Sequence, residues 1–154
     1  MTHTEKLQFL AGLEKECPNL GPNQGKCADA SIGFVCSECQ GTGKVAQFPM
    51  LRRKCPRCNK GYTDSVSDGF AGASTQFPPK CSFCQGRGWI PVDSLEATLD
   101  ALATLGLNVK LVRAMRTMQW IAVLFEHNME SPCGYSAASS SPNGATVDAL
   151  AMHV

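Results

Sequence analysis

The residues best suited to chemistry in this chain are its cysteines, nine among 154 residues, six of which form CxxC pairs. The pairs are Cys36–Cys39, Cys55–Cys58 and Cys81–Cys84. Two intervening residues form a tight turn that aims both thiolates at one tetrahedral ion, so each pair supplies half of a four-thiolate site. We therefore predict that all six cysteines are metal ligands and that the metal is Zn²⁺, with one or two ions bound.

Glycines follow the first and third pairs, which both read CxxCxGxG, whereas Asn-Lys-Gly61 follows the second pair. Glycine adopts positive φ without strain, which lets the chain curl around a sulfur and leaves backbone N–H groups facing the thiolate. Large apolar residues are few between the pairs. Metal affinity must therefore supply most of the folding free energy of this segment.

Six ligands fill one four-ligand site and half of another. Cys17 and Cys27 bracket a loop rich in Pro, Gly and Asn, and they are the nearest candidates for the remaining ligands. The spacing leaves open which pairs share an ion, because the first and second, the second and third, or the first and third pairs can each combine.

Disulfide and redox roles for the cysteines compete with zinc binding. Disulfides need an oxidising compartment, and residues 1–12 show no apolar core of a secretory signal. A thioredoxin-like site has one CxxC beside a βαβ pattern, not three in glycine-rich segments. Thiol–disulfide chemistry at a CxxC without a metal partner is kept as an alternative.

The repeated CxxCxGxG motif resembles the cysteine-rich zinc-finger domain of DnaJ-type co-chaperones. That family has four repeats, of which the outer two close one zinc site and the inner two another, whereas this chain shows three. No His-Pro-Asp tripeptide is present, so the J-domain that stimulates a partner ATPase is not expected. The resemblance implies a zinc-stabilised fold that presents a groove to unfolded or partner polypeptide chains.

Hydrophobic patterning predicts an α+β protein with an N-terminal helix in residues 1–16, a cysteine-rich, hairpin-rich region in 17–88 and a small domain in 89–154. Leucines at positions 7, 10 and 13 predict a helix from Thr4 to Glu16, capped by Thr2 or Thr4.

The last region reads as β-α-β-β-α. An extended segment at Trp89–Val92 precedes a helix that Asp93 or Ser94 caps and Gly106 ends. Strands follow at 107–111 and 118–125, then a loop over 126–143 and a closing helix over 145–152. This order implies a small antiparallel sheet packed against helices. It loosely resembles small α/β sandwich domains of bacteriophage proteins, which implies a phage accessory protein in the cytoplasm of a bacterial or infected cell.

The formal charge of +1 argues against a strongly basic nucleic-acid binder, and no apolar run is long enough to cross a membrane. One basic cluster is present, and it offers an alternative function in binding single-stranded RNA or DNA. Aromatic residues that could stack on bases are few near it, only Phe48 and Tyr62. Its cations can equally offset the charge of a zinc–thiolate site. The cluster consists of Arg52, Arg53, Lys54, Arg57 and Lys60.

Catalytic residues are hard to assign, because His127 near Cys133 is the only Cys–His neighbourhood and it lacks a third group. We expect a non-enzymatic, zinc-binding protein-interaction module with a polypeptide partner. Nucleic-acid binding and thiol–disulfide exchange are the alternatives. The oligomeric state is not predicted.

Overall fold

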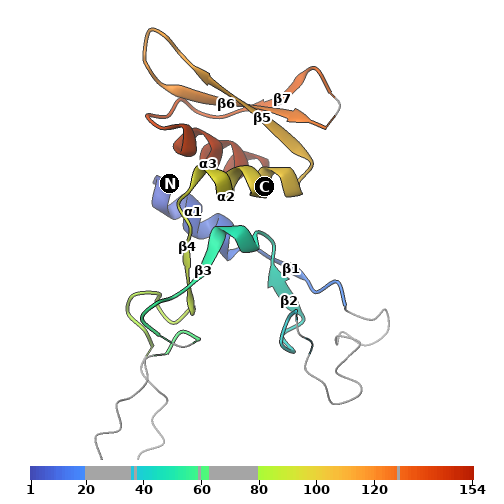
Figure 1. Cartoon of the computed structure of the whole chain (residues 1–154), viewed down its shortest axis with the longest axis vertical. Helices are drawn as coiled ribbons and strands as arrows, with labels where there is room; N and C mark the ends of the chain where they lie inside the picture. Colours follow the sequence, from blue (N-terminus) through green and yellow to red (C-terminus); the bar gives the residue numbers. More distant parts are fainter. Residues whose placement is uncertain (20–35, 37, 59, 63–79, 128) are drawn as a thin grey trace, which may run out of the picture.

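The computed structural model describes residues 1–19, 36, 38–58, 60–62, 80–127 and 129–154. A body of three helices and a three-stranded sheet carries two β-hairpins that extend from it like legs (Figure 1). All strand pairs are antiparallel. The predicted mixed α+β class is therefore confirmed.

The sheet of the body has the order β5-β6-β7, with helices α2 and α3 beneath it (Figure 1). Its elements are α2 (Leu95–Thr104), β5 (Leu107–Arg113), β6 (Trp120–Glu126), β7 (Pro132–Tyr135) and α3 (Pro142–His153). The predicted loop over 126–143 is wrong in part, because β7 lies within it. A short strand with Pro and Gly shows no alternating pattern, and its pairing with β6 depends on tertiary contacts.

Local signals set the ends of the helices. The Ser94 hydroxyl accepts a hydrogen bond from the Ala97 N–H at 3.1 Å, and Gly106 follows α2 with φ +72°. Ser141 caps α3 by accepting from the Gly144 N–H at 3.0 Å. Side-chain oxygens at these positions satisfy N–H groups that the first helical turn leaves without partners.

Helix α1 (His3–Gly12) begins with a capping box between Thr2 and Glu5, and it ends earlier than predicted. Residues Glu14–Glu16 form strand β1 instead of the last turn of the helix. Gly12 is a poor helix former, and Leu13 adopts an extended conformation. Pairing of β1 with residues 44–46 then outweighs the helical pattern.

One hydrophobic core joins α1 to the rest of the body. Leu10, Leu51, Leu102 and Leu150 are fully buried in it, so the core draws on α1, the segment Pro49–Leu51, α2 and α3. The Lys6 Nζ lies 2.7 Å from Asp148 Oδ1 and links α1 to α3. Both hairpins therefore start from one packed body.

Each hairpin is an antiparallel ladder of three residue pairs, and a long segment joins its two strands. The first pairs β1 with β2 (Lys44–Ala46), and the second pairs β3 (Arg52–Lys54) with β4 (Trp89–Pro91). The 3-10 helix η2 (Pro49–Leu51) connects them. The predicted strand at residue 89 thus exists, but it pairs with β3 and not with the sheet of the body. Among the described helices, none combines the length and the apolar character that a bilayer crossing requires.

Candidate metal centres

The second hairpin brings four cysteine sulfurs to within 4.8 Å of one another, from Cys55, Cys58, Cys81 and Cys84. The Sγ atoms of Cys55 and Cys81 lie 4.0 Å apart, and those of Cys58 and Cys84 lie 3.5 Å apart. A tetrahedral ion with metal–sulfur bonds of about 2.3 Å requires sulfurs about 3.8 Å apart. A disulfide would require about 2.05 Å. The spacing fits an ion held by the second and third CxxC pairs.

The backbone holds the two CxxC turns of this hairpin face to face. The Cys55 N–H donates to the Gly88 carbonyl at 3.0 Å, and the Cys81 N–H donates to the Gly61 carbonyl at 2.8 Å. Gly61 has φ +94°, and a Cβ placed on it would lie 2.1 Å from the Gly86 oxygen. Only glycine fits this contact, so Gly61 is required although the second pair lacks the full GxG pattern.

Two thiols of the second hairpin, Cys84 and Cys58, have pKa values shifted in opposite directions. The Gly88 N–H lies 3.3 Å from Cys84 Sγ. Desolvation acts against the thiolate, but this N–H and the neighbouring thiols stabilise it and lower the pKa of Cys84 to about 7. Desolvation and the hydrogen bonds among the thiols raise the pKa of Cys58 to about 12. A bound cation has to displace the proton of Cys58.

The first hairpin gathers a second group of sulfurs, from Cys17, Cys36 and Cys39, again within 4.8 Å of one another. All three residues are buried, and the Sγ atoms of Cys17 and Cys36 lie 3.8 Å apart. Cys17, predicted as a possible ligand, therefore joins the first CxxC pair. Cys27, the other possible ligand, lies outside the described residues.

The first hairpin repeats the plan of the second. The Cys17 N–H donates to the Gly43 carbonyl at 2.9 Å, as the Cys55 N–H does to Gly88. In both hairpins the ladder ends at the residue before that cysteine and the residue after that glycine. The sequence agrees, because Cys-Pro-Asn-Leu20 stands where the second hairpin has Cys-Pro-Arg-Cys58. The shared Cys-Pro dipeptide is a signal that sequence reasoning missed.

This plan explains how the ligands pair along the chain. The second and third CxxC pairs lie together, as the DnaJ-type resemblance implied. The first pair is joined from its N-terminal side by Cys17, where that family would use a fourth repeat. Two hairpins in tandem therefore replace a nested arrangement.

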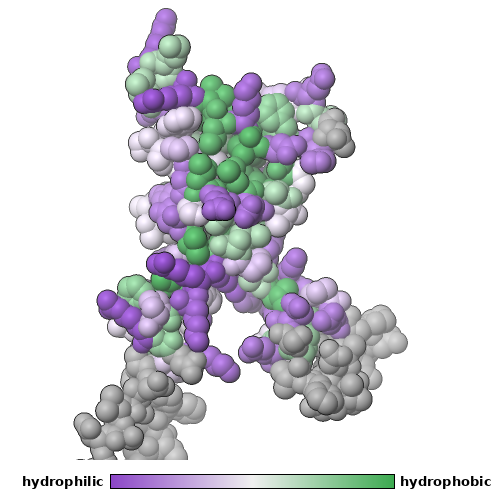
Figure 2. All heavy atoms as spheres, in the orientation of Figure 1, coloured by the Kyte–Doolittle hydropathy of each residue, from purple (hydrophilic) through white to green (hydrophobic). Residues whose placement is uncertain are grey.

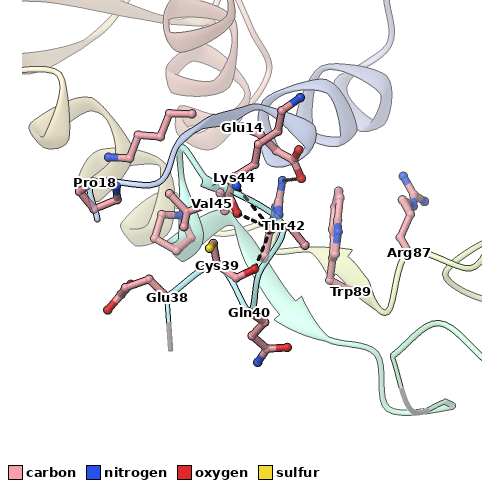
Figure 3. Close-up of a pocket in the computed structure, with 14 residues that line it drawn as sticks. Glu14, Pro18, Glu38, Cys39, Gln40, Thr42, Lys44, Val45, Arg87 and Trp89 are labelled. Atoms are coloured by element: carbon pink, nitrogen blue, oxygen red, sulfur yellow. Dashed lines mark hydrogen bonds and ion pairs between the residues drawn. The ribbon is translucent and has the colours of Figure 1, made fainter. Parts of the chain in front are cut away.

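A groove of about 720 Å³ separates the hairpins and is lined by residues of both. Figure 3 shows Val45 and Pro18 on one side of it and Trp89 and Arg87 on the other. The Trp89 ring has the guanidinium of Arg52 at 4.5 Å and that of Arg87 at 5.1 Å from its centroid. These contacts combine cation–π attraction with packing of the arginine stems.

Arg52 has a structural role at the base of this groove. Its guanidinium donates to the Ala11 carbonyl and, at 3.3 Å, to the Leu13 carbonyl. These bonds satisfy carbonyl groups at the end of α1 and connect the second hairpin to the start of the first. Arg52 was predicted as part of a basic cluster for nucleic acid, and these contacts engage its guanidinium within the protein.

The other cations of the predicted cluster, Arg53, Lys54, Arg57 and Lys60, are exposed. Phe83 was not singled out from the sequence, yet it is 45% exposed and has the Arg57 guanidinium 4.6 Å from its ring centroid. Phe48, by contrast, is buried in the core.

Cys133 and His127 show no catalytic arrangement in the described part of the chain. Cys133 is exposed on β7. His127 Nδ1 lies 3.4 Å from the Asn108 amide, which is its recorded side-chain partner.

Comparison with protein-family models, with curated proteins and with solved structures finds no match for this chain. The resemblance to the DnaJ-type zinc finger therefore rests on the CxxCxGxG motifs and on the grouping of their sulfurs.

Proposed function

We propose that both hairpins hold Zn²⁺ and that the chain is a non-enzymatic module that binds an extended polypeptide in the groove between them. Buried, all-thiolate ligand sets are typical of structural zinc, whereas catalytic zinc keeps an open position. Four described thiolates complete the site of the second hairpin. In the first hairpin, Cys27 is the proposed fourth ligand beside Cys17, Cys36 and Cys39.

The groove between the two hairpins is the observation that carries the polypeptide proposal. Val45, Pro49 and Trp89 give it apolar surface, and charges of both signs surround them. In the described structure each hairpin has only two strands, so its outer edges offer backbone N–H and C=O groups. An extended peptide can add to such an edge, with its side chains in the apolar part of the groove. Figure 2 shows the open space between the two legs.

A binding measurement with a matched surface variant tests this proposal. The probe is a fluorescently labelled, permanently unfolded polypeptide such as a reduced and carboxymethylated globular protein. Ala46→Arg places a long cation in the groove, and we expect it to weaken binding at least about tenfold with metal content unchanged. Val112→Arg, on an exposed position of β5, is the control.

Two results would contradict the groove proposal. The first is an unfolded probe that does not bind the zinc-loaded protein. The second is equal binding by the Ala46→Arg and Val112→Arg variants. Reduction of insulin disulfides by the zinc-loaded protein would instead support the thiol–disulfide alternative.

A further inference from the structure

The positive charge of this protein is concentrated in the second hairpin. Residues 49–91 contain seven of the fourteen Lys and Arg residues but only two of the thirteen acidic ones. The rest of the chain is net negative, so the overall +1 conceals a basic segment. A zinc ion with four thiolates carries a charge of −2. The charge of that zinc site therefore offsets less than half of the net positive charge of residues 49–91.

The second hairpin also carries exposed aromatic rings, one of which contacts a basic side chain. Phe83 is 45% exposed and Tyr62 is 41% exposed, and both lie next to the metal-binding turns. The Arg57 guanidinium stacks on the Phe83 ring. Exposed rings among cations combine two features of single-strand recognition, namely stacking surfaces for bases and contacts for phosphates.

The first hairpin supplies a comparison on the same scaffold. By the shared plan, Glu38 occupies the position of Phe83, in Cys-Ser-Glu-Cys against Cys-Ser-Phe-Cys. Strand β1 reads Glu-Lys-Glu where β3 reads Arg-Arg-Lys. Metal binding and backbone geometry do not require these differences, because the CxxCxGxG turns have positive φ at the same positions, Gln40, Gly41 and Gly43 against Gln85, Gly86 and Gly88, and both ladders pair three residues. The differences instead change what the surface attracts.

We infer that the second hairpin binds single-stranded nucleic acid beside its metal-binding turns, with an unpaired base stacked on Phe83 and phosphates held by the exposed cations. The cations are Arg53, Lys54, Arg57, Lys60 and Lys80. Neither Phe83 nor any of these cations lines the groove proposed for a polypeptide. Bases inside a duplex do not expose their faces, so the surface discriminates in favour of single strands.

Fluorescence anisotropy with the full, zinc-loaded chain tests this inference. The probes are a labelled single-stranded oligonucleotide of mixed sequence, as DNA and as RNA, and the duplex of the same sequence. We expect at least one single strand to bind more tightly than the duplex. Its affinity should fall with salt, with a logarithmic slope of about −0.7 for each phosphate contacted.

Phe83→Ala should weaken single-strand binding by about 5- to 150-fold, which corresponds to about 1–3 kcal/mol for one stacked base. Phe83→Trp should retain binding. Lys54→Gln should reduce the salt slope by about 0.7. Lys110→Gln with Arg116→Gln removes exposed charge from the body and should leave binding unchanged.

Metal content is measured for every variant, so that a loss of folding is not mistaken for a loss of binding. Equal affinity for duplex and single strand would overturn the inference. So would unchanged affinity in Phe83→Ala with its metal retained. The Ala46→Arg variant should bind single strands normally, which separates a failure here from a failure of the groove proposal.

Discussion

The two hairpins of this protein share one backbone plan and differ in their ligands and surfaces. In both, a strand enters a cysteine whose N–H donates to a glycine carbonyl across the hairpin. The second hairpin groups four described sulfurs, and the first groups three, with Leu20 at the sequence position of the fourth. The second is basic, and the first has mixed charge.

This comparison separates what metal binding requires from what it permits. Ion geometry constrains the cysteines, the positive-φ residues after them and the backbone hydrogen bonds. Side chains that point away from the sulfurs are unconstrained. Residues such as Glu38 and Phe83 can therefore differ completely on one scaffold, which lets two similar hairpins serve different purposes.

Removal of a ligand from the complete site should have the largest effect. Cys81→Ser should lower the zinc content from two ions per chain to one and unfold the second hairpin, because zinc contributes about 10–16 kcal/mol to the folding of small structural sites. Elemental analysis and limited proteolysis measure the two effects. Cys133→Ser, at an exposed cysteine far along the chain, is the control and should change neither.

The role of Cys27 as the fourth ligand of the first hairpin can be tested by removing it and placing a cysteine at position 20 instead. We expect Cys27→Ser to lose the ion of the first hairpin to a chelator that leaves the second ion in place. Adding Leu20→Cys should restore it, because that position corresponds to Cys58. A Cys27→Ser protein that keeps both ions under the same chelator would show that Cys27 is not a ligand.

Two glycines with positive φ, one in each hairpin, should differ in their tolerance of a methyl group. Gly61→Ala should cost about 3 kcal/mol or more, since its Cβ would lie 2.1 Å from a backbone oxygen at positive φ. Gly43→Ala has φ +73° with no atom within 4 Å, so only the strain of about 1–2 kcal/mol applies. The chelator concentration that removes the ion from the substituted hairpin measures the effect of each variant. Equal destabilisation by Gly61→Ala and Gly43→Ala would contradict the face-to-face packing.

Metal affinity of the second hairpin should also change continuously with pH, without any substitution in that hairpin. The pKa of Cys58 is raised to about 12, so its thiol is protonated at neutral pH and the ion must displace that proton. Affinity should therefore rise at least about tenfold for each pH unit between about pH 7 and pH 9. Competition with a chelator of known affinity, in a Cys36→Ser protein that keeps the second hairpin, measures it. An affinity independent of pH would contradict the protonation of Cys58.

Sequence reasoning succeeded where the cause of structure is local. Asp93 or Ser94 was predicted as the helix cap, and Ser94 is the one; Gly106 as the helix end is confirmed, because each signal depends on a few neighbouring residues. It failed where a distant segment competes with a local pattern. Glu14–Glu16 continue the helical pattern of α1, but pairing with residues 44–46 makes them a strand.

The sequence by itself determined which residues can bind a metal, since CxxC turns and the glycines after them are defined within a few positions. Only the tertiary structure decided that Cys17 joins the first pair, that Trp89 pairs with β3, and that Phe83 lies exposed under Arg57. These outcomes depend on contacts between segments far apart in the chain. Such contacts are fixed by the burial of one shared core and by convergence of sulfurs on one point, and neither is encoded in any short stretch.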